Sequence, residues 1–295
     1  MQRSDKQATI CLNQFFENFK AGYVNDIHNL LTDDVEFHVI GRPGVVPFAG
    51  IYKGKVEVVA YLDSFITVNE SVDLIVQYHL CDARESKRIA SHVNIISQVQ
   101  STGKRSDLEF LYKWELVDRL DKMKNLTLYY STWHMTEAFS KGGDGFILDQ
   151  RGSDDVTTIQ VAFDTAAAAA DLYDKFYVQG DVAAAFEAMN DDIVVVEKGN
   201  PRLPSNGSPK GKEAVRELIN GVFSYQVYVT PPIFRNYITQ DNRTDVTLDV
   251  HFGDALTGKD FHITLNHSLI FDKNGLLLEL KSYHDSQEIW MNHLN

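Results

Sequence analysis

The sequence predicts an α+β protein in which one domain plan occurs twice. Two stretches repeat the same order of side-chain types: Phe15 to Gly22 and, 158 positions further along, Tyr173 to Gly180. The same offset relates Asp33-Asp34-Val35 to Asp191-Asp192-Ile193. In each copy, helical periodicity comes first and strand-like alternation follows. This order predicts helices that precede a mostly antiparallel sheet.

Alternating apolar residues define the strands of the first copy. Over 107–117 every second residue is apolar and the residues between are mostly charged or polar, as in a strand with one face on a core. The periodicities predict helices over 10–22, 26–31 and 56–66, a loop over 41–54, and strands over 35–39, 72–80, 86–100, 107–117 and 125–133.

The second copy repeats this plan after a predicted linker. Residues 141–156 gather Gly, Ser and Asp without periodicity, so we expect domains over 1–140 and 157–295. A helix is expected to begin near Thr157 and to run through an alanine-rich stretch to Gly180. Further elements are predicted as strands 192–197, 227–237, 244–252, 260–271 and 276–284, with a loop over 199–211 and a helix over 212–222.

Composition excludes some classes of partner. The 295 residues are 44% hydrophobic, which allows two domains of about 150 residues with separate cores. The net charge of -13 and the lack of a basic run argue against nucleic acid or an anionic membrane surface as partner. The sequence lacks a signal-peptide pattern and a membrane-spanning apolar run, and Cys11 and Cys81 suit reduced thiols. We therefore expect a cytoplasmic protein.

Two motifs resemble a known superfamily. The segments Pro47-Phe48-Ala49-Gly50-Ile51-Tyr52-Lys53-Gly54 and Phe271–Gly275 with Tyr283-His284-Asp285 are similar to the nuclear-transport-factor-two-like superfamily, above all its SnoaL-like cyclases and ketosteroid isomerases. The resemblance implies two tandem cone-shaped domains, each a curved sheet wrapped by about three helices around a small-molecule pocket. It also implies that the two domains form a pseudo-dimer, and it leaves further homo-oligomerisation open. It does not imply one reaction.

The resemblance assigns roles to three residues. In ketosteroid isomerases a carboxylate base works beside a tyrosine and a protonated aspartic acid that hold the oxyanion. Counted position by position, the tyrosine matches Tyr173 and the base matches Glu197. The third position matches His267 instead of an acid, which departs from the ketosteroid isomerase pattern.

The residue pattern indicates the same place independently. His267 is the one titratable group in an otherwise apolar strand row, and His284 ends a similar row on the next strand. Tyr173 and Tyr177 lie four residues apart on one helix face. Glu197 ends a row that is otherwise apolar. We expect all five side chains to converge inside the second domain, with Tyr177 and His284 binding the ligand.

The first copy provides a comparison. The positions equivalent to the five predicted site residues are, by the same counting, Phe15, Phe19, Val39, Tyr112 and Thr132. These residues predict a filled or apolar pocket in the first domain. Polar groups kept in only one copy are more easily explained by function than by a packing need.

The predicted function is proton transfer on a small, partly apolar molecule that carries a carbonyl or hydroxyl group. Such a protein would be an isomerase, cyclase or dehydratase without cofactor, and the histidine spacings predict no metal site. The alternative is a non-catalytic pair of domains that binds a ligand or docks another protein. Each polar residue also has a structural alternative, because the tyrosines and histidines could be hydrogen-bonded core residues and Glu197 could reach solvent.

Overall fold

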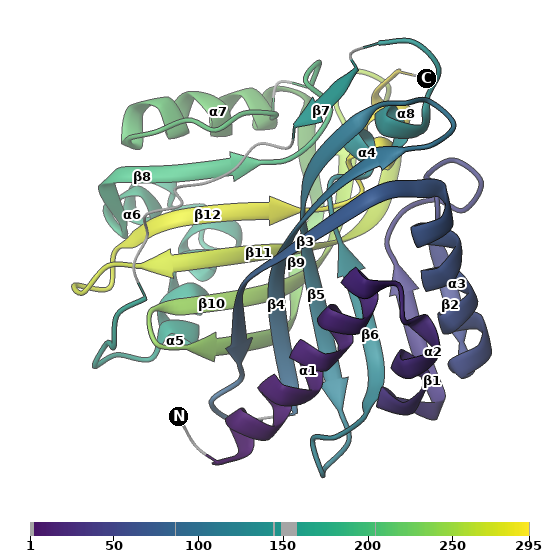
Figure 1. The fold of residues 1–295 in the computed structure, drawn as a ribbon. Helices are drawn as coiled ribbons and strands as arrows, with labels where there is room; N and C mark the ends of the chain where they lie inside the picture. Colours follow the sequence, from purple (N-terminus) through teal and green to yellow (C-terminus); the bar gives the residue numbers. More distant parts are fainter. Residues whose placement is uncertain (1–2, 86, 144, 149–157, 204, 295) are drawn as a thin grey trace. The chain divides into compact units, whose positions relative to one another are not determined.

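The computed structural model describes residues 3–85, 87–143, 145–148, 158–203 and 205–294. It divides into two compact units, Met1–Asp149 and Gln150–Asn295, which we call the N-terminal and C-terminal units. Each unit combines helices with one curled sheet (Figure 1), so the predicted α+β class is confirmed. Of the predicted linker, residues 144 and 149–156 lie outside the described residues.

The N-terminal unit begins with helices and continues with strands. Its elements are α1 (Arg3–Ala21), α2 (Val24–Ile27), η1 (His28–Leu30), β1 (Leu31–Val39), β2 (Gly50–Lys53), α3 (Gly54–Val68), β3 (Asn69–Cys81), β4 (Arg88–Val99), β5 (Arg105–Leu116), β6 (Met123–Tyr129), α4 (Thr132–Phe139) and β7 (Phe146–Leu148). The strands follow the order β2-β1-β6-β5-β4-β3, and β7 pairs with β5. Only the β1–β6 and β5–β7 pairs are parallel among the described strands of this unit.

Three local predictions for this unit differ from the structure. The strand predicted over 125–133 ends at Tyr129, because Tyr130 leaves the sheet and its hydroxyl donates to the Ile40 carbonyl at 3.0 Å. Helix α4 follows, and its first turn is closed by the bond from Met135 N to Ser131 O at 3.1 Å. The predicted loop over 41–54 contains β2, and the predicted linker contains β7.

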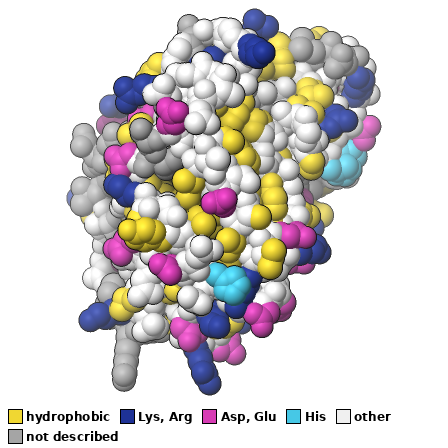
Figure 2. Space-filling view, turned by 45° about the vertical axis from the view of Figure 1, so that its right-hand side comes forward, with side chains coloured by type: hydrophobic (Ala, Val, Ile, Leu, Met, Phe, Trp, Pro, Cys, Tyr) yellow, Lys and Arg dark blue, Asp and Glu magenta, His cyan; other side chains and the backbone are white. Residues whose placement is uncertain are grey.

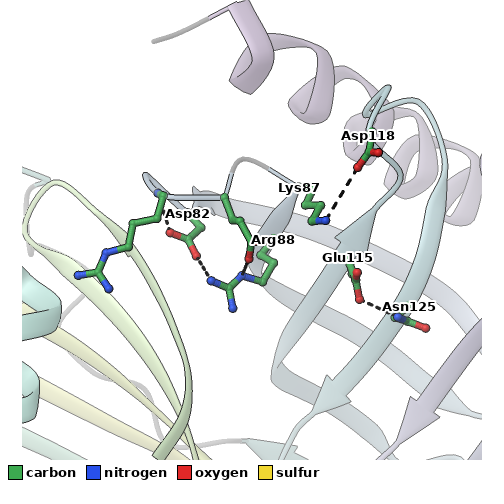
Figure 3. Close-up of polar contacts among 8 residues, drawn as sticks. Asp82, Lys87, Arg88, Glu115, Asp118 and Asn125 are labelled. Atoms are coloured by element: carbon green, nitrogen blue, oxygen red, sulfur yellow. Dashed lines mark hydrogen bonds and ion pairs between the residues drawn. The ribbon is translucent and has the colours of Figure 1, made fainter.

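Polar contacts hold the turns at one end of this sheet. Figure 3 shows Arg88, at the start of β4, whose Nη2 lies 2.8 Å from Oδ2 of the buried Asp82. On the neighbouring strands the Asn125 amide donates to Glu115 Oε2 at 2.7 Å. Because Asp82 is buried, its ion pair with Arg88 satisfies a charge that would otherwise be costly to enclose.

The C-terminal unit repeats the plan with its own sheet. Its elements are α5 (Thr165–Tyr173), the π-helical turn η2 (Asp174–Val178), α6 (Val182–Glu187), β8 (Met189–Glu197), α7 (Lys212–Tyr225), β9 (Gln226–Gln240), β10 (Arg243–Asp254), β11 (Asp260–Phe271), β12 (Leu277–Tyr283) and α8 (Ser286–Leu294). The strand order is β8-β12-β11-β10-β9, and β8 to β10 can be followed side by side in Figure 1. Only β8 and β12 are parallel among these strands.

The first helix of this unit begins later than the sequence predicts. The expected start near Thr157 lies outside the described residues, and residues 158–164 are not helical. The helix begins at Thr165 because the Asp164 carboxylate accepts from Ala166 N at 2.9 Å and Ala167 N at 3.3 Å, which satisfies two backbone donors of the first turn. The α-helix ends at Tyr173 and continues directly as the π-helical turn to Val178, close to the predicted end at Gly180.

The surface carries charges of both signs. On the face drawn in Figure 2, basic side chains alternate with acidic ones and no basic patch gathers. Among the described residues, no helix combines the length and the apolar character needed to cross a bilayer.

Candidate functional site

A cavity of about 140 Å³ lies inside the C-terminal unit. Its wall is made by side chains of α5, η2, α7 and one face of the sheet. All five predicted site residues line it: Tyr173, Tyr177, Glu197, His267 and His284. The structure thus brings the five side chains to one place, while their roles in chemistry stay a prediction.

Strand register places three polar side chains in one row of the cavity wall. Glu197 of β8 is paired with Ser282 of β12, and Ser282 is paired with His267 of β11. Paired residues on neighbouring strands point to the same face of a sheet, and neighbouring strands lie about 4.8 Å apart. The backbones of Glu197 and His267 are therefore separated by roughly 10 Å across the row.

At one end of the row, Tyr173 and His267 form a hydrogen-bonded pair. The Tyr173 hydroxyl lies 2.9 Å from His267 Nδ1, and both side chains are buried. Burial lowers the pKa of His267 to about 3, helped by the neighbouring His284. Burial likewise raises the pKa of Tyr173 well above 10. Near neutral pH this pair therefore carries no charge.

At the other end, Glu197 meets His284 and Ser282. Its Oε1 lies 3.3 Å from His284 Nδ1, which is also 3.3 Å from Ser282 Oγ. Burial raises the pKa of Glu197 to about 8, and a hydrogen bond from Ser282 acts in the opposite direction. Burial lowers the pKa of His284 to about 4. Both shifts favour an uncharged pair near neutral pH, with a protonated carboxyl group beside a neutral imidazole.

A group of aromatic rings forms another part of the wall. The Tyr228 hydroxyl donates to the Tyr177 hydroxyl at 3.3 Å, and their rings meet edge to face with centroids 4.9 Å apart. Burial raises the pKa of Tyr177 to about 12, so its hydroxyl keeps its proton. Nearby, the Tyr225 hydroxyl donates at 2.7 Å to Ser205, which also lines the cavity.

Sequence reasoning did not select Ser282, Tyr228 or Ser205. Ser282 was detectable, because it alternates with Leu280 and His284 on the same strand face. Tyr228 and Ser205 lack such a signal. Ser205 lies in the long segment between β8 and α7, and its position depends on tertiary contacts.

The N-terminal unit has apolar side chains in the equivalent row. Val39 pairs with Leu128, and Leu128 pairs with Tyr112, which repeats the pairing of Glu197, Ser282 and His267. By this register His284 corresponds to Tyr130, and the predicted equivalent Thr132 is wrong. Counting failed because the number of residues between equivalent strands differs in the two copies.

Aromatic rings occupy the positions of the site tyrosines and histidine in the N-terminal unit. Phe15 packs against Trp114 with ring centroids 4.9 Å apart, and Phe16 meets Tyr112 at 5.2 Å. Phe15 and Phe19 are buried. The polar row is therefore a feature of the C-terminal unit, since its counterpart in the other unit is apolar.

No set of three or more His, Cys, Asp or Glu side chains is arranged to hold a metal ion within the described parts of the chain.

Comparison with known proteins gives similarity at the level of structure. No model of a known protein family matches the chain, and no curated protein sequence matches it. Solved structures that resemble it include an NTF2-like protein of unknown function from Burkholderia pseudomallei, with 15% identity, a TM-score of 0.39, and coverage of 44% of this chain and 98% of that one.

Two further solved structures have named functions or ligands. A protein from Mesorhizobium loti assigned as a SnoaL-like polyketide cyclase has 21% identity and a TM-score of 0.35, over 41% of this chain and 99% of that one. A Mycobacterium tuberculosis protein in complex with estradiol-17β-hemisuccinate has 20% identity and a TM-score of 0.37, over 42% of this chain and 94% of that one. The solved structures similar to this chain thus include NTF2-like and SnoaL-like proteins, the group that its sequence resembles.

Proposed function

We propose that the C-terminal unit is an enzyme of the isomerase, cyclase or dehydratase type, which moves a proton on a small molecule carrying a carbonyl or hydroxyl group. The observation that carries this proposal is that one cavity is lined by both the largely buried Glu197 carboxyl and the hydrogen-bonded Tyr173–His267 pair. A base and an oxyanion donor on opposite sides of a ligand are the two parts that enolisation of a carbonyl compound requires.

Glu197 acts as the base in this scheme. A carboxylate whose pKa is about 8 has a much higher proton affinity than an ordinary glutamate, because its charged form is poorly solvated in the cavity. It can therefore remove a proton from a carbon atom next to a carbonyl group and return it elsewhere on the same molecule. His284 and Ser282, both at hydrogen-bonding reach of this cluster, orient the carboxyl group.

His267, whose ring Tyr173 positions, stabilises the oxygen on which negative charge develops. Both groups are neutral near pH 7, so the imidazole N–H donates to this oxygen without a competing charge. Donors held in place before the reaction stabilise an oxyanion more than water does, because they need no reorganisation. Tyr177, whose hydroxyl accepts from Tyr228, contacts the body of the ligand together with His284.

Exchange of carbon-bound protons tests this scheme without knowledge of the natural substrate. Cyclohex-2-enone in D₂O is followed by proton NMR in the presence of the full chain. We expect the protein to accelerate deuterium incorporation, and Glu197→Gln to lower the rate by about 100- to 10,000-fold, the usual contribution of a general base. Glu217→Gln, at an exposed position of α7, serves as the matched control and leaves the rate unchanged. Equal exchange in both variants, or none in the unmodified protein, contradicts the proposal.

A further inference from the structure

We propose that the ligand of the C-terminal cavity is an uncharged molecule with a single six-membered ring and a carbonyl or hydroxyl oxygen, such as a cyclic enone or a phenol. This inference narrows the proposed function and rests on it for the location of the site. Three properties of the cavity carry it: its volume, the absence of lysine and arginine from its described lining, and the combination of a polar row with aromatic side chains in its wall.

The volume limits the ligand to about one ring. A dry cavity of about 150 Å³ in another protein binds benzene, and the cavity between the sheet and α7 measures about 140 Å³. A molecule of four fused rings is larger than this volume. The steroid derivative present in the Mycobacterium tuberculosis structure is of that larger kind. Interiors are close-packed, so extra rings would have to displace side chains such as Leu248 and Phe252.

The wall offers no counter-charge to an ionic ligand. Neither lysine nor arginine occurs among the described residues that line the cavity, and the ionisable ones are Glu197, His267, His284 and tyrosines. Two basic residues of α7, Lys212 and Arg216, have partners outside the cavity: Lys212 Nζ lies 2.9 Å from Asp191, and Arg216 lies 4.8 Å over the Phe186 ring. Enclosing an unpaired charge costs several kcal/mol or more, so ions are rejected.

The protonation states agree with this selection. Burial raises the pKa of Glu197 and lowers the pKa values of His267 and His284, and each shift favours the neutral form of the group near pH 7. A carboxylate ligand would find no cation there, and an ammonium ligand would find a carboxyl group that keeps its proton. An uncharged oxygen, in contrast, can accept from these groups without any change in their charge.

The wall combines a row of polar groups with aromatic side chains, which fits an amphipathic ring. The polar groups stand in the row of Glu197, Ser282 and His267 on the sheet. The aromatic side chains come mainly from η2, α7 and β9: Phe176 stacks on Phe223 with centroids 5.6 Å apart, and Tyr177 meets Tyr228 at 4.9 Å. A flat ring packs against such faces and edges, while its oxygen points to the polar row.

Binding measurements with four probes test the inference. The full chain is titrated by calorimetry with cyclohex-2-enone, cyclohexene, cyclohex-1-ene-1-carboxylate and androst-4-ene-3,17-dione. We expect the enone to bind. Cyclohexene lacks the oxygen and the carboxylate carries a charge, so each should bind at least about 10-fold more weakly. The steroid is expected not to bind. Carboxylate or steroid affinity equal to or above that of the enone overturns the inference.

A cavity-filling variant links binding to this site. Leu248→Phe adds volume to the wall, and we expect it to weaken enone binding at least 10-fold. Val229→Phe, at an exposed position of β9, is the matched control and leaves binding unchanged. Enone binding that survives Leu248→Phe in the folded protein, checked by circular dichroism, places the ligand elsewhere and contradicts the inference.

Binding and turnover separate this inference from the proposed function. If the enone binds but exchanges no protons, the proposal of a single-ring ligand stands and the proton-transfer chemistry fails. If protons are exchanged on the steroid but not on the enone, the proton-transfer chemistry stands and the proposal of a single-ring ligand fails.

Discussion

The hydroxyl of Tyr173 lies 2.9 Å from Nδ1 of His267, although the two residues are 94 positions apart in the chain. Both groups are neutral near pH 7, because burial lowers the pKa of His267 and raises that of Tyr173. With the hydroxyl donating to Nδ1, the imidazole proton is assigned to Nε2. In this arrangement His267 donates to the ligand, and Tyr173 is a positioning residue that selects the tautomer.

Tyr173→Phe is expected to remove the preference of His267 for the tautomer protonated on Nε2. Nitrogen-15 NMR of the His267 ring should show Nε2 protonated in the unmodified protein and a mixture of tautomers in the variant. The proton-exchange rate should fall by roughly 10-fold or more, which corresponds to about 1.4 kcal/mol of lost stabilisation. Tyr23→Phe, at an exposed position, is the control and changes neither signal. An unchanged His267 spectrum in Tyr173→Phe would show that the tautomer has another cause.

The rate should depend on pH through Glu197. Its pKa is raised to about 8 by burial, so only the fraction that has lost its proton can act as base. We expect kcat/KM to rise with pH up to a plateau above about 8. The rising limb should be absent in Glu197→Gln. A rate that falls through the same range would indicate that Glu197 is a general acid.

Ser282→Ala should move this pH profile. The hydrogen bond from Ser282 lowers the pKa of Glu197, so its removal leaves the burial effect less opposed. The inflection in kcat/KM should therefore shift to higher pH. Ser224→Ala, at an exposed position of α7, provides the control. An inflection that stays in place or moves to lower pH is incompatible with this role of the serine.

Glu197 should also affect how stability changes with pH. Its folded pKa of about 8 lies above the ordinary 4.5, so the folded state holds the proton more tightly. Its contribution is fully present below about pH 4.5 and is lost as the pH rises through 8. The free energy of unfolding of the unmodified protein, minus that of Glu197→Gln, should decrease between pH 5 and 8. A difference that is constant with pH would mean that the carboxyl is solvated.

The two buried histidines change the pH dependence of stability in the direction opposite to that of Glu197. Their folded pKa values, about 3 for His267 and about 4 for His284, lie below the ordinary 6.5. Their contribution to stability is present above pH 6.5 and is lost as the pH falls toward 4. The free energy of unfolding, measured with urea, should fall less between pH 6.5 and 4 in His267→Gln than in the unmodified protein. His262→Gln is the control, and an identical slope in both variants would contradict burial of the His267 ring.

The aromatic interior of the N-terminal unit should be structural. Phe15 is 1% exposed and packs on Phe16, Phe19 and Trp114. Phe15→Ala should lower the free energy of unfolding of this unit by about 3–5 kcal/mol. Enone binding in the C-terminal unit, measured where the variant is folded, should be unchanged. A parallel loss of binding would indicate a role of Phe15 beyond packing.

Several expectations from the sequence remain predictions. They are the domain boundaries at 140 and 157, the pseudo-dimer of the two domains, and the cytoplasmic location. The catalytic roles of Glu197, His267 and Tyr173 and the ligand-binding roles of Tyr177 and His284 also await the experiments above.

The sequence by itself determined the order of the elements and the face on which each site residue lies. Both are local properties, because strand alternation and helical spacing follow from backbone geometry within a few residues. The internal repeat added the contrast between Glu197 and Val39, which share a strand position with opposite polarity. The start of α5 was missed because a single side chain, Asp164, decides it.

Only the tertiary structure decided which side chains meet. The pairs Tyr173–His267 and Glu197–His284 join segments far apart in the chain, and their contact depends on strand register and on the lengths of the intervening connections. The same dependence explains why counting assigned Thr132 in place of Tyr130. The pKa of Glu197 follows from enclosure on several sides at once, a property that no local pattern of residues contains.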